Sequence, residues 1–143
     1  QSSLPRPVIG NAGLSALEWH WSLERYGAPQ VNSRFESASE EGRRMGWQDW
    51  ASWTGTRAIL TSYAKSGSTD HAEVLAYMKS SRLRLDGSKG QTQSLREWDG
   101  QMRQPILLTT DNAVIGIAPF DGFLHETNTL DSLGVDQPEF SCE

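Results

Sequence analysis

The sequence predicts a mixed α/β fold, because helical and strand patterns occupy different parts of it. A stretch from Trp47 to about Lys65 contains no proline and has the spacing of an amphipathic helix. A second helical pattern begins at Asp70, and two apolar, β-branched runs surround Asp111-Asn112. The 143 residues have the length of one domain.

Residues near the start of the chain predict a helix. Ser15 and Glu18 have the spacing of a capping box, so a helix is expected from Ser15 to about Tyr26. Gly27 would end this helix, and Pro29 would prevent the chain from continuing it. The polar stretch 33–46 that follows is expected to be an exposed turn of helix or a loop.

The middle of the chain predicts a pair of helices. At about 100° per residue, eight side chains of the first helix share roughly half of its circumference. They are Trp47, Trp50, Ala51, Trp53, Thr54, Ala58, Leu60 and Ala64. Asp70 is expected to cap the second helix, with Glu73 three residues later and an apolar stripe of Val74, Leu75 and Met78. The two helices should form a helical hairpin.

The second half of the chain predicts strands and turns. The stretch 91–98 is expected to be a strand, and the runs 105–110 and 113–119 should pair as a β-hairpin. Asp86 and Asp99 each precede a glycine, which is typical of turns. From Asp121 onward no periodicity is sustained, so an irregular chain lying on a surface is expected.

The charge distribution excludes some functions. The formal net charge is −5, and residues 104–143 contain seven acidic residues and no base. A chain without a basic stripe is not expected to bind nucleic acid, and the acidic residues of the tail are expected to be solvated rather than to hold a cation. No run of 18 apolar residues occurs.

No motif in the sequence predicts an enzyme, a metal site or a cofactor. His20, His71 and His125 lie far apart and none has the spacing of a zinc motif. His20, between two tryptophans, is expected to be a half-buried histidine. Cys142 is the only cysteine, so it is an inert thiol, a reactive thiol or half of a bridge to another chain.

Six tryptophans are the remaining unusual feature. Trp47, Trp50 and Trp53 are expected to anchor a core or an interface, because they share one helix face. Trp19 and Trp21 would lie about 200° apart on the predicted helix. One of these two is therefore expected to be exposed, at a ligand cleft or against another subunit.

The order of these features resembles a known family. A strand and loop at Val8 to Gly13 are followed by helices, by Gly67-Ser68-Thr69-Asp70, by Trp98-Asp99-Gly100-Gln101 and by a terminal hairpin. This order resembles the C-terminal portion of type I periplasmic substrate-binding proteins of the branched-chain amino acid class. It is most similar to a subgroup associated with PQQ-dependent alcohol oxidation, which Gly27-Ala28-Pro29-Gln30 and Gly122-Phe123-Leu124-His125 also resemble.

The resemblance implies where a ligand would bind. Members of the family have two α/β lobes, close on a small ligand by a hinge, and are usually more than twice this long. Residues 1–32 would then be the end of one lobe with a cleft loop and helix, and residues 33–143 the helices, hairpin and tail of the terminal lobe. The expected ligand-binding residues are Asn11, Gly13, Trp19 and His20. Asn11 stands near the position of an acidic residue in amino-acid binders, so a different ligand class is possible.

The resemblance also implies partners and a compartment. The chain would be part of a periplasmic solute-binding protein that works with a missing N-terminal part or second chain, and with a membrane ABC permease. Cys142 would be available for an inter-chain disulfide in the oxidising periplasm. The alternative is a stand-alone periplasmic accessory protein that docks on a dehydrogenase or another subunit through exposed tryptophan.

Overall fold

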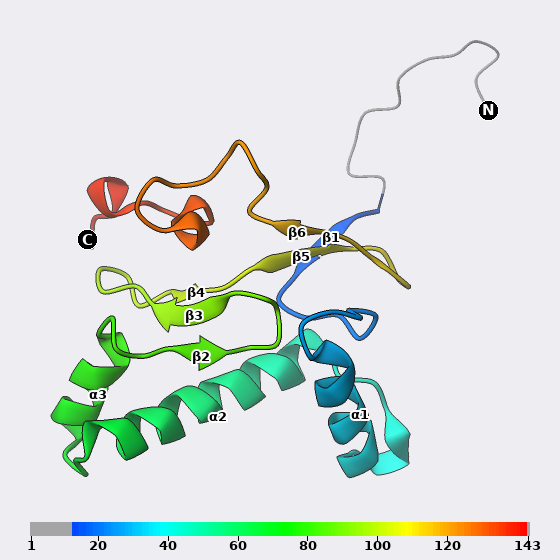
Figure 1. Ribbon diagram of the computed structural model, residues 1–143, viewed down its shortest axis with the longest axis horizontal. Helices are drawn as coiled ribbons and strands as arrows, with labels where there is room; N and C mark the ends of the chain where they lie inside the picture. Colours follow the sequence, from blue (N-terminus) through cyan, green and yellow to red (C-terminus); the bar gives the residue numbers. More distant parts are fainter. Residues whose placement is uncertain (1–12, 143) are drawn as a thin grey trace.

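A computed structural model describes residues 13–142 and has a mixed α/β architecture (Figure 1). The helices are α1 (Ala28–Ala38), α2 (Trp47–Ser66) and α3 (His71–Lys79), with short 3-10 turns η1 (Glu40–Gly42), η2 (Thr129–Ser132) and η3 (Gln137–Glu139). The strands are β1 (Ser15–Leu17), β2 (Leu85–Asp86), β3 (Thr92–Leu95), β4 (Met102–Arg103), β5 (Ile106–Thr109) and β6 (Val114–Ala118). The predicted α/β class is confirmed.

The strands form two antiparallel sheets of three strands each. In one sheet β5 lies between β1 and β6, and in the other β3 lies between β2 and β4. The chain passes from the second sheet to the first through Gln104 and Pro105, which join β4 to β5 (Figure 1). The predicted β-hairpin around Asp111-Asn112 is confirmed, with Thr109 opposite Val114.

The predicted helix from Ser15 to Tyr26 is wrong. Residues 15–17 form β1, which pairs with β5 so that Ser15 lies opposite Thr109. The helix begins at Ala28 instead, after Gly27 adopts a left-handed conformation with φ 82°. Pro29 lies in the first turn of α1, where a missing N–H costs nothing. The two residues that the pattern gave as stop signals therefore precede and begin a helix.

The predicted helical hairpin is confirmed as α2 and α3, although less of α2 is buried than expected. Asp70 caps α3 by accepting hydrogen bonds from the amides of Ala72 and Glu73. Trp47, Ala51, Leu60 and Ala64 are exposed, contrary to the prediction. The buried stripe of α2 is narrower, with one residue in each turn: Trp50, Thr54, Ala58 and Ser62.

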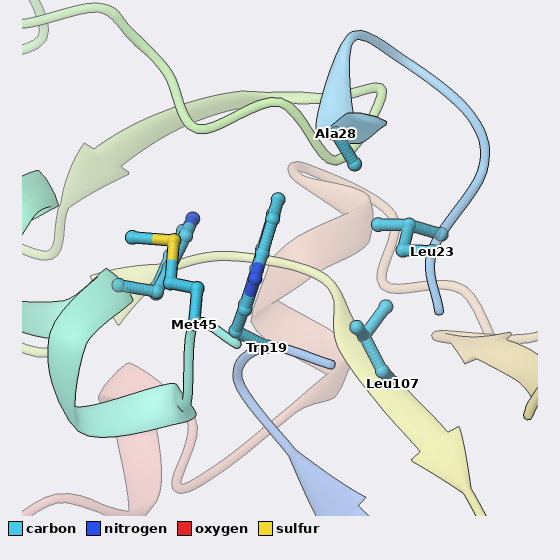
Figure 2. Packing of buried hydrophobic residues seen from close by; sticks show 6 residues of the cluster. Trp19, Leu23, Ala28, Met45 and Leu107 are labelled. Carbon is cyan, nitrogen blue, oxygen red and sulfur yellow. The ribbon is translucent and has the colours of Figure 1, made fainter. Parts of the chain in front are cut away.

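Two hydrophobic clusters hold the elements together. The larger one joins α1, α2 and β5 around Trp19, whose ring lies between Met45 and the side chains of Leu23 and Leu107 (Figure 2). The smaller one packs α2 and α3 against the second sheet, with Ala58, Tyr77, Leu83 and Leu85 at its centre. Both clusters contact α2, so this helix spans the molecule and connects its two halves (Figure 1).

The tail after β6 is irregular, as predicted, apart from η2 and η3. It lies beyond β4, on the side away from α2 (Figure 1). Leu130 and Asp131 are buried within it, and most of its other acidic residues are exposed or half-buried. The expectation of a solvated acidic tail is therefore wrong for Asp131, whose carboxylate forms ion pairs with two arginines.

Candidate functional site

Two stacked tryptophans lie at the centre of the larger cluster. The rings of Trp19 and Trp50 are nearly parallel, 8° apart, with their centroids separated by 5.9 Å. The indole N–H of Trp19 donates to Oδ1 of Asn32 over 3.0 Å, and that of Trp50 donates to the carbonyl of Gly87 over 3.1 Å. Both rings are almost completely buried, and both buried N–H groups have a partner, as such groups normally do.

A buried lysine completes this arrangement, which we call the tryptophan–lysine centre (Trp19, Trp50 and Lys89). The Lys89 ammonium lies 3.9 Å from the centre of the Trp50 ring. It donates to the carbonyls of Glu18 (2.9 Å) and Pro105 (2.7 Å) and to the side-chain oxygen of Gln104. These three acceptors are uncharged, and burial lowers the pKa of Lys89 to about 7. The amine therefore titrates near neutral pH while it ties several chain segments together.

Two glycines allow the lysine to enter the core. A side chain at Gly87 would place its first carbon 2.2 Å from the side-chain amide of Gln93. Gly90 has φ +87° and faces the Tyr26 ring, which lies 2.8 Å from where such a carbon would be. A larger residue at Gly87 would collide with Gln93, and one at Gly90 would collide with Tyr26 and be strained at its positive φ. The sequence indicates a turn at Asp86 and Gly87, but it does not indicate the buried amine of Lys89.

His20, next to Trp19, stabilises a backbone turn. Its Nδ1 lies 2.7 Å from the Ser22 hydroxyl and accepts the Ser22 amide hydrogen over 3.3 Å. Burial lowers the pKa of His20, and a backbone hydrogen bond with Asp111 opposes this effect. His125 makes a similar backbone contact, because its Nδ1 accepts from the amide of Thr127, two residues later. Both histidine rings thus stabilise a turn by accepting a hydrogen bond from the amide two residues later.

The predicted ligand-binding residues occupy different environments. Asn11 lies outside the described residues. Gly13 is exposed at the start of the described chain, with φ 80°. Trp19 and His20 are brought together, but both rings are buried and engaged in the contacts above, so neither ring is open to solvent. Cys142 is exposed and free. A direct role of these residues in ligand or disulfide binding stays a prediction.

A cavity lies immediately beside this turn. It has a volume of about 490 Å³, which is within the usual range of small-molecule sites. Its two walls are the turn from Ser22 to Tyr26 and strand β6, with Phe120 at the end of the strand. Polar groups of Ser22, Glu24 and Arg25 line one wall, while the other is apolar. The cavity therefore offers both kinds of contact to a small ligand.

A second buried cation lies at the other end of the molecule, in a group that we call the arginine clasp (Arg96, Arg103 and Asp131). Arg96 Nε and Arg103 Nε donate to the same oxygen of Asp131, over 2.9 and 2.8 Å. Arg96 also donates to the tail carbonyls of Asp131, Leu133 and Val135. Burial alone would raise the pKa of Asp131, but the hydrogen bonds from Arg103 and Arg96 outweigh it and lower the pKa. The clasp fixes the tail to β3 and β4.

Two further properties concern the described residues 13–142. Their histidine, cysteine and acidic side chains form no group of three or more that could hold a metal ion. None of their helices has the length and apolar character needed to cross a membrane.

Comparisons with known proteins give no assignment. No family profile, curated protein or solved structure matches this chain significantly.

Proposed function

We propose that this chain is the C-terminal part of a periplasmic solute-binding protein, which captures a small ligand when two parts of the binder close around it. The order of sequence motifs suggests the family, and a surface feature supports it. The proposal includes a second part, either N-terminal in the same polypeptide or a separate chain, and a membrane ABC permease that receives the ligand. A link to PQQ-dependent alcohol oxidation is part of the same proposal.

The observation that carries the proposal is the apolar edge around β6. This strand is an edge of its sheet, so one side of its backbone has no neighbouring strand among the described residues. Ile115 on β6 is 62 % exposed and Phe123, in the segment that follows, is 80 % exposed, and Phe120 and Leu124 are also exposed. An unpaired strand edge with several exposed apolar side chains on or near it is typical of a surface that another chain segment or subunit covers.

The cavity between β6 and the Ser22–Tyr26 turn gives this edge a ligand-binding role. Its lining includes Ile115 and Phe120 of the apolar edge on one side and polar groups of the turn on the other. A second part that covered β6 would close it, and a ligand held there would contact both parts. Such a contact favours the closed state, which is the physical basis of hinge closure.

The predicted binding residues then fall into two roles. Asn11, which lies outside the described residues, and Gly13 are proposed to contact the ligand. Trp19 and His20 are proposed to support the Ser22–Tyr26 turn, because both are packed inside the molecule.

The first test determines the size and location of the natural protein. Antibodies against this chain are used on a periplasmic extract of cells that make it, with and without reductant. We expect a periplasmic species larger than this chain. A species that shrinks on reduction would assign the second part to a disulfide partner of Cys142. A free monomer of this size in the cytosol would refute the proposal.

The second test asks whether that species binds a small ligand. Thermal unfolding is measured with amino acids, carboxylic acids formed from alcohols, quinone cofactor and lanthanide ions. We expect one class to raise the unfolding temperature. If none does, and the chain is recovered with a dehydrogenase or another large partner, the accessory-protein alternative replaces the binder.

The third test examines the β6 edge with a matched pair of substitutions. Ile115→Ser changes β6, and Leu60→Ser changes a residue of α2 that is equally exposed, at 63 %. We expect Ile115→Ser to weaken the interaction with the second part, and Leu60→Ser to leave it unchanged. Equal effects of both substitutions would exclude the β6 edge as the specific contact.

A further inference from the structure

A second hollow, separate from the cavity beside β6, lies between α1 and the first turns of α2. We call it the α1–α2 groove. It has a volume of about 450 Å³ and shares no lining residue with the other cavity. Its apolar lining consists of Val31, Phe35, Ala38, Met45 and Trp53. Val31, Phe35 and Ala38 recur at helical spacing, so one whole face of α1 forms a wall.

The aromatic walls of the groove are held in place by arginines. The Arg43 guanidinium lies 4.7 Å from the centre of the Phe35 ring, and that of Arg57 lies 4.7 Å from the centre of the Trp53 ring. Arg57 is itself fixed by a hydrogen bond to the carbonyl of Asp86. A pocket whose walls are already oriented loses little entropy when a ligand enters, which favours binding of a small molecule.

The charged side chains that line the groove determine which class of ligand can bind. Asp49 lines the groove, but Arg43 donates to both of its oxygens over 2.7 and 2.8 Å, and the Gly46 amide donates to one of them. Arg34 also lines the groove, is exposed, and has no hydrogen-bond or ion-pair partner among residues 13–142. The negative charge of Asp49 is thus balanced by Arg43, and Arg34 brings one unpaired positive charge to the lining of the groove.

We propose that the α1–α2 groove is a binding site for a small carboxylic acid with an aromatic or branched apolar body, whose carboxylate pairs with Arg34. The apolar body lies between Phe35 and Trp53, above Met45. A planar guanidinium suits a carboxylate, because it can donate two parallel hydrogen bonds. The site is distinct from the cavity assigned to the binder's own ligand, so either proposal can fail without the other.

The test uses three probes that share one apolar body and differ in charge. They are 3-phenylpropanoate, 3-phenylpropan-1-ol and 3-phenylpropylamine, each titrated to low millimolar concentration into the ¹⁵N-labelled chain. The indole N–H signal of Trp53, identified by its loss in Trp53→Phe, reports occupation of the groove. We expect the acid to bind best and the amine worst.

Two substitutions separate the charge from the shape of the groove. Arg34→Gln should reduce the affinity for the acid about two- to fivefold, to that of the alcohol, and leave the alcohol unaffected. Arg84→Gln, which changes an exposed arginine that lines neither the groove nor the other cavity, is the matched control and should leave the affinity for each probe unchanged. Ala38→Phe fills the groove from an exposed position and should abolish the Trp53 response to each probe.

Three results would overturn the proposal. The first is an equal affinity for acid and amine, which would remove the role of Arg34. The second is the absence of a Trp53 response to any probe. The third is a Trp53 signal that shifts with protein concentration alone, which would assign the groove to contact with a second copy of the chain.

Discussion

The tryptophan–lysine centre and the arginine clasp each bury one cation, in opposite ways. The side chains of Lys89 and Arg96 are both 1 % exposed. Lys89 is held by three uncharged oxygens and a tryptophan ring, whereas Arg96 is paired with the buried carboxylate of Asp131. Burial lowers the pKa of Lys89 more than the charge of Glu18 raises it, so this amine can lose its proton. A guanidinium cannot, so the two regions differ in their response to pH.

The two responses have the same sign but fall in different pH windows, because the pKa of each group is lowered in the folded chain. The pKa of Lys89 in the folded chain, about 7, lies below its ordinary value of 10.5. The unfolded chain therefore binds more protons between these two values, and the free energy of unfolding rises with pH across that window. The pKa of Asp131 is lowered from 3.8, so the stability that it contributes is complete above pH 3.8 and is lost as the pH falls through the folded value.

The largest expected effect comes from breaking the clasp. Asp131→Asn removes the buried carboxylate that Arg96 and Arg103 share, and leaves Arg96 only its pair with Asp99 over 3.2 Å. Loss of one partner of a buried pair costs about 3–5 kcal/mol. Urea unfolding at pH 7 measures the loss. We also expect the tail after β6 to become sensitive to proteolysis while the α2–α3 hairpin stays protected.

The control for this substitution is Asp136→Asn in the same tail. Asp136 pairs with His125 over 3.3 Å, and its side chain is 36 % exposed, so its loss should cost less than about 1 kcal/mol. Similar losses for the two substitutions would show that burial of the ion pair does not determine the strength of the clasp.

A substitution at the tryptophan–lysine centre is expected to cause a smaller loss of stability than Asp131→Asn. Lys89→Met keeps most of the side-chain volume but leaves the acceptors of Glu18, Gln104 and Pro105 without their donor. At pH 9 we expect a loss of about 1–3 kcal/mol, and at pH 6 a smaller one, because the wild-type chain then keeps a costly buried charge. Urea unfolding at several pH values measures the difference, which can change by at most about 1.4 kcal/mol per pH unit.

Lys79→Met is the matched control for this pH dependence. Lys79 lies at the exposed end of α3, so its replacement should give a difference that does not vary between pH 6 and pH 9. A constant difference for Lys89→Met as well would mean that the Lys89 amine is charged throughout this range in the folded chain.

Local signals in the sequence predicted much of the fold. The α3 helix follows from Asp70, whose side chain bonds to amides two and three residues away. The β5–β6 hairpin follows from a turn between two β-branched runs. By contrast, β1 pairs with a strand about 90 residues later, and no local pattern contains that partner. The capping-box spacing of Ser15 and Glu18 therefore predicted a helix where a long-range pairing forms a strand.

The candidate site was less predictable for the same reason. Lys89 and Trp50 are far apart in the sequence, as are Arg96 and Asp131, and each of these residues alone has an ordinary surface or core interpretation. The prediction that one of Trp19 and Trp21 is exposed, at a ligand cleft or against another subunit, was based on a helix that the structure does not contain. Trp19 is in the core, and Trp21 is half-buried beneath the guanidinium of Arg44, 3.5 Å from its ring centre.

The smallest expected effect tests whether His20 belongs to the tryptophan–lysine centre or only to its adjoining turn. If its function is to accept a hydrogen bond from the Ser22 amide, asparagine can replace it. An asparagine side chain can accept a hydrogen bond from the backbone amide two residues later. His20→Leu has no acceptor and should lose about 1 kcal/mol at pH 7.5, with His20→Asn losing less.

Stability measured at acidic pH distinguishes the two possible roles of His20. Its pKa in the folded chain is below 6.5, so the stability of the neutral ring is complete above pH 6.5 and declines as the pH falls through the folded value. The wild-type chain should therefore approach His20→Asn in stability between pH 7.5 and pH 5, as measured by urea unfolding. A difference in stability that stays constant between pH 7.5 and pH 5 would mean that the folded chain tolerates the charged ring. His20 would then contribute through its packing beside Trp19 and not through the turn.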